Sequence, residues 1–163
     1  MKKIKQLFLV VFICALTISL TGCKSSNLDG TLKDIMESVY SEVYTGLSDD
    51  EKPMLGNINV SEDMQDNIAY YIGTEDIEYE EILASEPMMG SIAHSVVLVR
   101  MKENADIEAA KKSIKENVDP RKWICVEVPE DKVIVESKGN VIILIMVADD
   151  TTREKLKEGF DNL

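Results

Sequence analysis

The stretch that decides the fold is residues 132–147, KVIVESKGNVIILIMV. Two apolar runs, at 132–136 and 141–147, flank the tripeptide Lys138-Gly139-Asn140. β-Branched residues favour strands, and a glycine–asparagine pair accepts the positive backbone angles of a tight turn. This stretch therefore predicts an antiparallel hairpin.

Upstream of this hairpin, residues 95–99 (SVVLV) are apolar on both faces, which predicts a central strand covered on each side. In residues 75–81, apolar and acidic side chains alternate, which is typical of a strand with one solvated face. The break at residues 87–90 predicts that the two strands pair as a hairpin. The short apolar run 68–72, which ends at Gly73, reads as a further strand, and residues 46–63 read as a solvated loop without the ligand pattern of a calcium site.

Three segments have helical periodicity. Apolar residues recur at helical spacing from Leu32 to Val43, with Asp29 or Thr31 as the cap and Gly46 at the end. A second helix follows a cap at Asn104 or Asp106 and stops at Asp119-Pro120, and residues 151–154 (TTRE) resemble a capping box that opens a last helix through Phe160.

This order of elements predicts an α+β fold, with a mostly antiparallel sheet of about four to five strands and three helices packed against it. Residues 95–163 match the order of a split βαβ unit.

The N-terminus carries a different signal. Leu20-Thr21-Gly22-Cys23 looks like a bacterial lipobox, behind a positive segment with three lysines and an apolar run at 7–20. That run is shorter than the about 20 residues of a membrane span. We expect a lipoprotein signal peptide at 1–22 with cleavage between Gly22 and Cys23, a lipidated Cys23 and short tether at 23–28, and a single α+β domain at 29–163. The alternatives are a spanning helix or an ordinary secretory signal.

Charge bounds the function. The chain has 163 residues, with 18 basic and 30 acidic side chains and a formal net charge of −12. Because residues 1–22 hold three lysines and no acid, cleavage would leave 15 basic against 30 acidic residues, or −15. Such a charge argues against binding nucleic acid or anionic lipid headgroups. Attachment to the membrane is then expected to rest on the lipid of Cys23, on the extracytoplasmic face of the cell membrane.

Arg121, Lys122 and Trp123 are the best candidates for a binding site. Two cations beside the only tryptophan can bind an anionic or sugar ligand by charge and stacking. The favoured alternative places Trp123 in the core, with Arg121 and Lys122 exposed and paired to nearby acids.

Met88, Met89 and Cys125 raise a similar choice. The methionines can form a flexible recognition surface or fill the core at a hairpin turn, and the second is favoured. Cys125 lies in the apolar run 123–126 and is expected to be a buried small hydrophobe.

Three segments carry a resemblance to a known family: residues 119–126 (DPRKWICV), 88–95 (MMGSIAHS) and 137–140 (SKGN). Together they resemble domain-of-unknown-function family 4358, small lipoproteins of Gram-positive anaerobes, over roughly residue 32 to the C-terminus. The resemblance implies a surface lipoprotein and brings no activity, ligand or cofactor with it.

The residues favour a lipid-anchored binding or interaction module with a protein partner at the cell envelope. We expect no enzyme, cofactor or metal, because the chain has one histidine and neither a Ser-His-Asp order nor a glycine-rich phosphate loop. The alternatives are a small carboxylate-dependent hydrolase and a ligand-binding accessory to a transporter.

Overall fold

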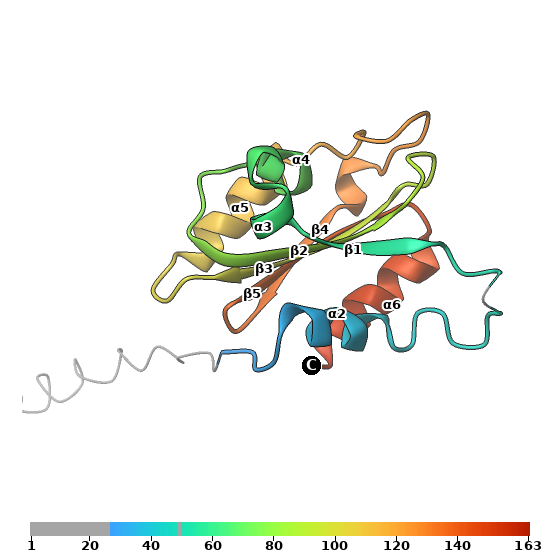
Figure 1. The fold of residues 1–163 in the computed structure, drawn as a ribbon, viewed down its shortest axis with the longest axis horizontal. Coiled ribbons are helices and arrows are strands. Elements are labelled where there is room, and N and C mark those ends of the chain that lie inside the picture. The colour runs from blue at the N-terminus through green and yellow to red at the C-terminus, as the bar shows by residue number, and fades with distance from the viewer. Residues whose placement is uncertain (1–26, 49) are drawn as a thin grey trace, which may run out of the picture.

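The structure is a computed structural model that describes residues 27–48 and 50–163. The predicted signal peptide, Gly22 and Cys23 lie outside the described residues. Within them, five strands form one antiparallel sheet with the order β1-β2-β3-β5-β4 (Figure 1). The strands are β1 (Leu55–Asn59), β2 (Tyr79–Pro87), β3 (His94–Met101), β4 (Ile134–Lys138) and β5 (Val141–Val147).

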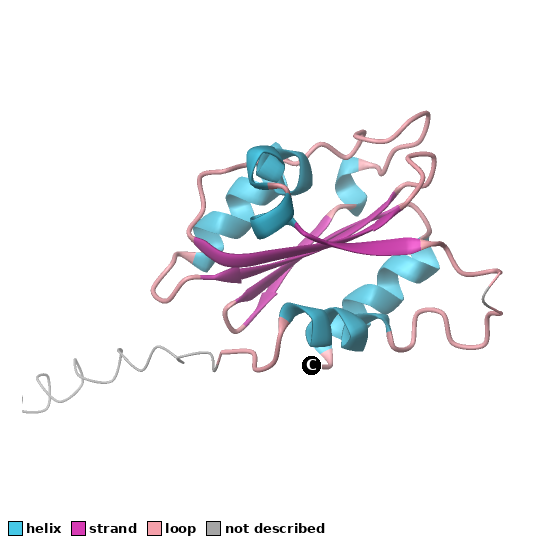
Figure 2. Ribbon diagram, viewed as in Figure 1, coloured by secondary structure: helices cyan, strands magenta, loops and turns pink. Residues whose placement is uncertain are grey.

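Helices cover both faces of the sheet (Figure 2). One face carries α2 (Leu32–Tyr40) and α6 (Asp150–Asp161), and the other carries α3 (Val60–Asp63), α4 (Ile68–Ile72) and α5 (Ile107–Asn117). Short 3-10 turns lie at Gln65–Asn67 and Glu130–Lys132. The predicted α+β fold is confirmed, with helices on both sides of the sheet. No described helix has the length and apolar character that crossing a bilayer requires.

The two central strands are buried along nearly their whole length, because each alternates its side chains between two cores. Val97 and Val99 of β3 face α5, while Val96 and Leu98 face α2 and α6. Burial of each such side chain stabilises the fold by about 1.5–3 kcal/mol. The prediction that this run is a central strand covered on each side is confirmed.

The C-terminal half forms the expected split βαβ unit. Strand β3 leads through α5 to β4, and β5 lies between β3 and β4 in the sheet. The β4–β5 turn is at Gly139 and Asn140, with Lys138 opposite Val141 and Gly139 at φ 59°. Strand β4 begins two residues later than predicted, since the 3-10 turn at Glu130–Lys132 takes up the first part of that run.

Side chains cap the three longer helices. Thr31 and Asp34 form a capping box at the start of α2, and Asp106 caps α5. The predicted capping box at residues 151–154 is wrong: Asp149 caps α6, and its Oδ2 accepts a hydrogen bond of 2.7 Å from the backbone N–H of Thr152. An aspartate suits this position because its charge complements the helix dipole.

Residues 68–72 form helix α4 and not the predicted strand. Ile68, Tyr71 and Ile72 are buried at i, i+3 and i+4, a spacing that a five-residue run cannot distinguish from a short strand. Gly73 ends this helix at φ 79°, where an added Cβ would lie 2.2 Å from the backbone nitrogen of Val118. The glycine is required both for its backbone angle and for this close approach.

Two other segments differ from expectation. The predicted loop at 46–63 contains strand β1 and helix α3, and residues 75–77 form a turn ahead of β2. Strand β2 runs on through Pro87, so the hairpin with β3 forms as predicted but with a later break. Strand β1 has few apolar residues, which is why its sequence resembles a loop.

Candidate interaction surface

Five large apolar side chains are exposed at the end of the molecule where β1 starts and β2 ends. The exposed fractions are 73% for Met54, 75% for Met88, 65% for Met89, 72% for Ile124 and 47% for Tyr70. Monomeric proteins rarely leave a large contiguous apolar patch in water unless it binds something. We call these five residues the methionine surface.

Backbone contacts join the three segments that carry Met54, Met88 with Met89, and Ile124. The backbone N–H of Met88 donates to the carbonyl oxygen of Met54 at 3.1 Å, and that of Ile124 donates to the carbonyl oxygen of Gly90 at 2.8 Å. The side chain of Ile124 also lies over Gly90, 3.8 Å from the position of a Cβ there. The segment after α5 is therefore fastened to the β2–β3 hairpin.

Beneath this surface lies a buried ion pair. The Nζ of Lys122 is 2.5 Å from Oε1 of Glu86, and the exposed fractions of the two side chains are 2% and 10%. The Ser95 hydroxyl donates to the same carboxylate oxygen at 2.7 Å, and Lys122 Nζ lies 3.3 Å from Ser95 Oγ. Burial lowers the pKa of Lys122, and the Glu86 carboxylate opposes that shift.

Aromatic rings surround the ammonium group. Lys122 Nζ lies 4.5 Å from the ring centre of Tyr70, 5.3 Å from that of Tyr71 and 5.6 Å from that of Trp123. Such contacts favour a cation by about 0.5–2 kcal/mol each, more when it is shielded from water. The indole Nε1 of Trp123 is buried without a hydrogen-bond partner, so packing and the cation hold this ring.

The five residues that the sequence singled out for binding lie on two segments, the β2–β3 connection and the loop after α5, which the Ile124–Gly90 bond joins. Trp123 is buried and Arg121 is exposed, as predicted, but among the described residues the Arg121 side chain forms no ion pair, so its predicted pairing with an acid is wrong. The prediction of an exposed Lys122 is wrong, although its pairing with an acid is confirmed: four methylene groups let it reach back from the loop to Glu86. The core role favoured for Met88 and Met89 is also wrong, because both lie in the loop that leaves the sheet.

Cys125 is exposed, and its predicted burial is wrong. The run 123–126 forms no strand, and Cys125 adopts φ 61°, which turns the chain there and leaves Ile124 and Cys125 outside. Ile124 was not expected at a surface, because nothing in an apolar run shows which of its members is left uncovered, whereas Met54 lies in the stretch that was predicted to be solvated.

A second polar cluster lies on the opposite face of the sheet. A hydrogen bond of 2.7 Å joins Tyr40 Oη and His94 Nε2, and the Tyr40 ring stacks on both His94 and Tyr44. Burial lowers the pKa of His94 to about 4 and raises that of Tyr44 to about 12. Since His94 is 3% exposed, it stands neutral in the interior and is not available to a substrate.

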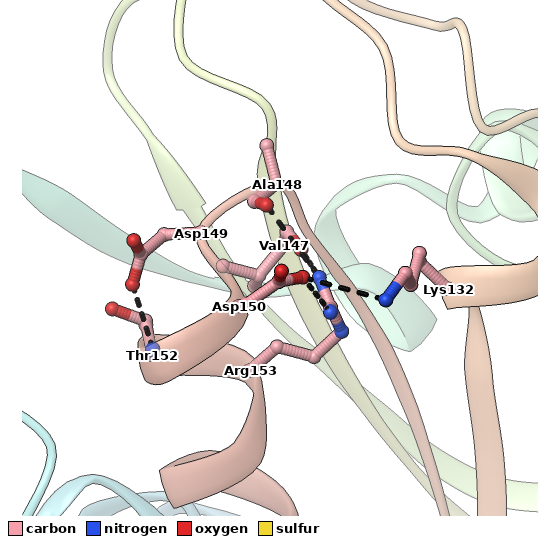
Figure 3. Close-up of polar contacts among 7 residues, drawn as sticks. All are labelled: Lys132, Val147, Ala148, Asp149, Asp150, Thr152 and Arg153. Carbon is pink, nitrogen blue, oxygen red and sulfur yellow. Dashed lines mark hydrogen bonds and ion pairs between the residues drawn. The ribbon is translucent and has the colours of Figure 1, made fainter.

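A third cluster fastens α6 to the end of β5 (Figure 3). Arg153 is buried and donates to the carbonyl oxygens of Val147 at 2.9 Å and Ala148 at 3.5 Å, and it also pairs with Asp150. Lys132 lies 3.7 Å from the same carboxylate. The charged groups of this cluster are thus paired with one another or with backbone carbonyl oxygens, which indicates a structural role.

A shallow acidic hollow of about 560 Å³ lies between the 75–78 turn and α5. Its acids are Glu75, Asp76, Glu78 and Asp106, and all four are exposed. A catalytic acid works in a site that shields it and the substrate from water, whereas these four carboxylates lie open to solvent. Across residues 27–48 and 50–163, no group of three or more His, Cys, Asp or Glu side chains is arranged to hold a metal ion.

The chain matches no known protein family, and no curated protein or solved structure is significantly similar to it. The resemblance to family 4358 therefore stays a prediction.

Proposed function

We propose that this protein is a non-catalytic module, anchored by a lipid on Cys23 to the extracytoplasmic face of the cell membrane, and that the methionine surface binds a protein partner in the cell envelope. The observation that carries the proposal is the gathering of five exposed apolar side chains at one end of an otherwise acidic molecule. Methionine adapts its shape to a partner and is common at surfaces that bind other proteins.

The position of the N-terminal segment supports this arrangement. Arg100, near the end of β3, donates to the carbonyl oxygens of Leu28 at 3.0 Å and Gly30 at 2.7 Å, and Asn140 accepts a bond of 3.2 Å from the backbone N–H of Leu28. The β2–β3 connection, which carries Met88 and Met89, lies at the other end of the sheet (Figure 1). The eight residues of β3 separate the two ends by roughly 25 Å, at about 3.3 Å per residue. An anchored chain would thus present this surface away from the bilayer.

The catalytic alternatives have less support. The candidate nucleophiles are Ser95, which lies near Lys122, and Ser85, and the candidate base is His94. All three side chains are at most 3% exposed. A nucleophile must reach its substrate, and these side chains are sealed within the packed layers. The exposed acids of the shallow hollow favour neither a hydrolase nor a ligand pocket.

Two measurements test the proposal. For the anchor, wild-type protein should incorporate a labelled fatty acid, whereas Cys23→Ser should accumulate as unlabelled precursor; normal labelling of that variant would refute the lipid on Cys23.

For the surface, membranes extracted with mild detergent should contain the wild-type chain in a complex larger than the monomer. The double variant Met88→Ser/Met89→Ser should lose the complex, while Lys112→Ser on α5 should keep it. Equal complexes for both variants would argue against a role of the methionine surface.

A further inference from the structure

Strand β1 is an open edge of the sheet, and its register shows which backbone groups lack a partner strand. Met88 donates to the carbonyl of Met54, so residues 54, 56 and 58 direct their backbone groups toward β2. Leu55 and Asn57 alternate with them and direct their N–H and C=O groups outward. Asn59 directs its N–H outward, while its C=O belongs to the N-cap of α3. Pro87, which has no N–H, stands opposite Leu55 and fits this assignment, because no donor is needed there.

The other edge of the sheet is protected. Strand β4 carries the charged residues Glu136 and Lys138 and contacts both α5 and α6. Lysines form hydrogen bonds at both of its ends: Lys115 donates to the carbonyl oxygen of Val133, and Lys138 donates to that of Asp161. Charges and covering helices are the usual means of blocking strand addition at an edge.

Strand β1 has none of these devices in its own sequence, LGNIN, which contains no charged residue and no proline. Asn57 is exposed and no atom lies within 4 Å of a Cβ built on Gly56. Met54 and Met88 face each other across the start of the β1–β2 pair, so the methionine surface continues onto this edge.

Charge indicates what kind of segment fits. Residues 50–66, which contain β1, carry five acids and one lysine. Asp50 and Glu51 precede the strand, and Glu62, Asp63 and Asp66 follow it; all five are exposed. A second copy of this chain would bring the same acids and a net charge of −12 to the interface, which opposes pairing of two β1 edges.

We propose that β1 binds an extended segment of a protein partner, with alternating apolar residues and flanking lysines or arginines, which adds to the sheet as a sixth strand. Backbone hydrogen bonds from Leu55, Asn57 and Asn59 hold the segment, the methionine surface takes its apolar side chains at one end, and the flanking acids attract its cations. The inference rests on the proposed function for the identity of the partner as a protein, and it adds the mode of binding.

The test uses the ¹⁵N-labelled mature chain and a capped peptide of alternating valine and lysine. Addition of the peptide should slow the exchange of the amide protons of Leu55, Asn57 and Asn59 by about tenfold or more, with little change in β4. A peptide with glutamate in place of lysine should bind at least about tenfold more weakly. A valine–lysine peptide N-methylated on alternate backbone amides, so that it cannot pair, should give no protection.

The matched variants are Asn57→Pro and Gly56→Ala. Asn57→Pro removes an outward N–H that β2 does not use, and proline is tolerated at an open edge, so this variant should fold and lose peptide binding. Gly56→Ala has room for its methyl group and should bind as wild type.

Several results would overturn the inference. These are protection at β4 in place of β1, equal protection by the N-methylated peptide, no protection at β1 by any peptide, or a wild-type chain that already dimerises through β1. The test of strand addition and the test of the proposed function can give different answers. If Met88→Ser/Met89→Ser loses the membrane complex but no peptide adds to β1, the methionine surface is supported as a binding site and strand addition at β1 is refuted. If a peptide adds to β1 but the wild-type chain forms no membrane complex, strand addition is supported and the proposed function is refuted.

Discussion

The ammonium group of Lys122 lies 2.5 Å from the carboxylate of Glu86, among three aromatic rings, and both side chains are largely buried. Lys122 belongs to the loop after α5, whereas Glu86 lies near the end of β2. The pair therefore ties two segments of the methionine surface to each other, and its removal should affect both stability and binding.

Removal of one partner should be more harmful than removal of both. Lys122→Met or Glu86→Gln alone leaves a buried group without its partner and should lower the free energy of unfolding by about 3–5 kcal/mol. The double variant Lys122→Met/Glu86→Leu should recover most of this loss. Urea unfolding followed by Trp123 fluorescence measures all three, and additive losses in the double variant would show that the two groups do not interact.

The stability should fall in mildly acidic solution because of His94. Its pKa is about 4 in the folded chain against an ordinary value of 6.5, so between these values only the unfolded chain binds the proton. The stabilisation is complete above pH 6.5 and is lost as the pH falls toward 4, by about 3 kcal/mol at about 1.4 kcal/mol per pKa unit.

His94→Gln removes this titration, so the free energy of unfolding of the variant should change less with pH between 4 and 6.5 than that of wild type. The Tyr40 hydroxyl, whose pKa is raised by burial, stays neutral throughout and does not contribute. Parallel curves for the two proteins would show that His94 is not the responsible group.

The exposed methionines should contribute little to folding. Met88→Ser/Met89→Ser should change the free energy of unfolding by less than about 0.5 kcal/mol, because water already surrounds these side chains. Leu98→Ala, a matched change at a fully buried position, should cost about 2–5 kcal/mol. Comparable losses in the two proteins would mean that the methionines are packed in solution.

The thiol of Cys125 should react in the native protein. It is exposed in a loop, so a maleimide reagent should modify it at a rate close to that of an unfolded control. In the mature chain, whose Cys23 carries the lipid, Cys125→Ala should take up no label. Modification only after addition of denaturant would place Cys125 in the core.

The sequence predicts the sheet well where the pattern is long. Residues 141–147 and 95–99 are apolar at nearly every position, whereas a strand with one covered face needs apolar residues only at every second position. Both form interior strands whose alternate side chains enter the two cores. The caps Thr31 and Asp106 are also found where side chains of the right type precede a periodic run.

The remainder depends on contacts that a local pattern does not contain. Gly73, which ends α4, packs against the end of α5, and β1 pairs with β2; both contacts join segments that are far apart in the sequence. At the candidate surface, the sequence selected Met88, Met89 and Trp123; the predicted burial is correct for Trp123 and wrong for the two methionines. The deciding contact, between Lys122 and Glu86, joins residues 36 positions apart.

The measurement that tests the account most directly is photo-crosslinking in intact cells from position 89, with position 112 on α5 as the control. With p-benzoylphenylalanine in place of Met89, we predict one discrete adduct with a membrane or envelope protein, and no such adduct with the same probe in place of Lys112. Equal adducts from the two positions, or none from position 89 in correctly anchored protein, would contradict the role of the methionine surface as the site of partner binding.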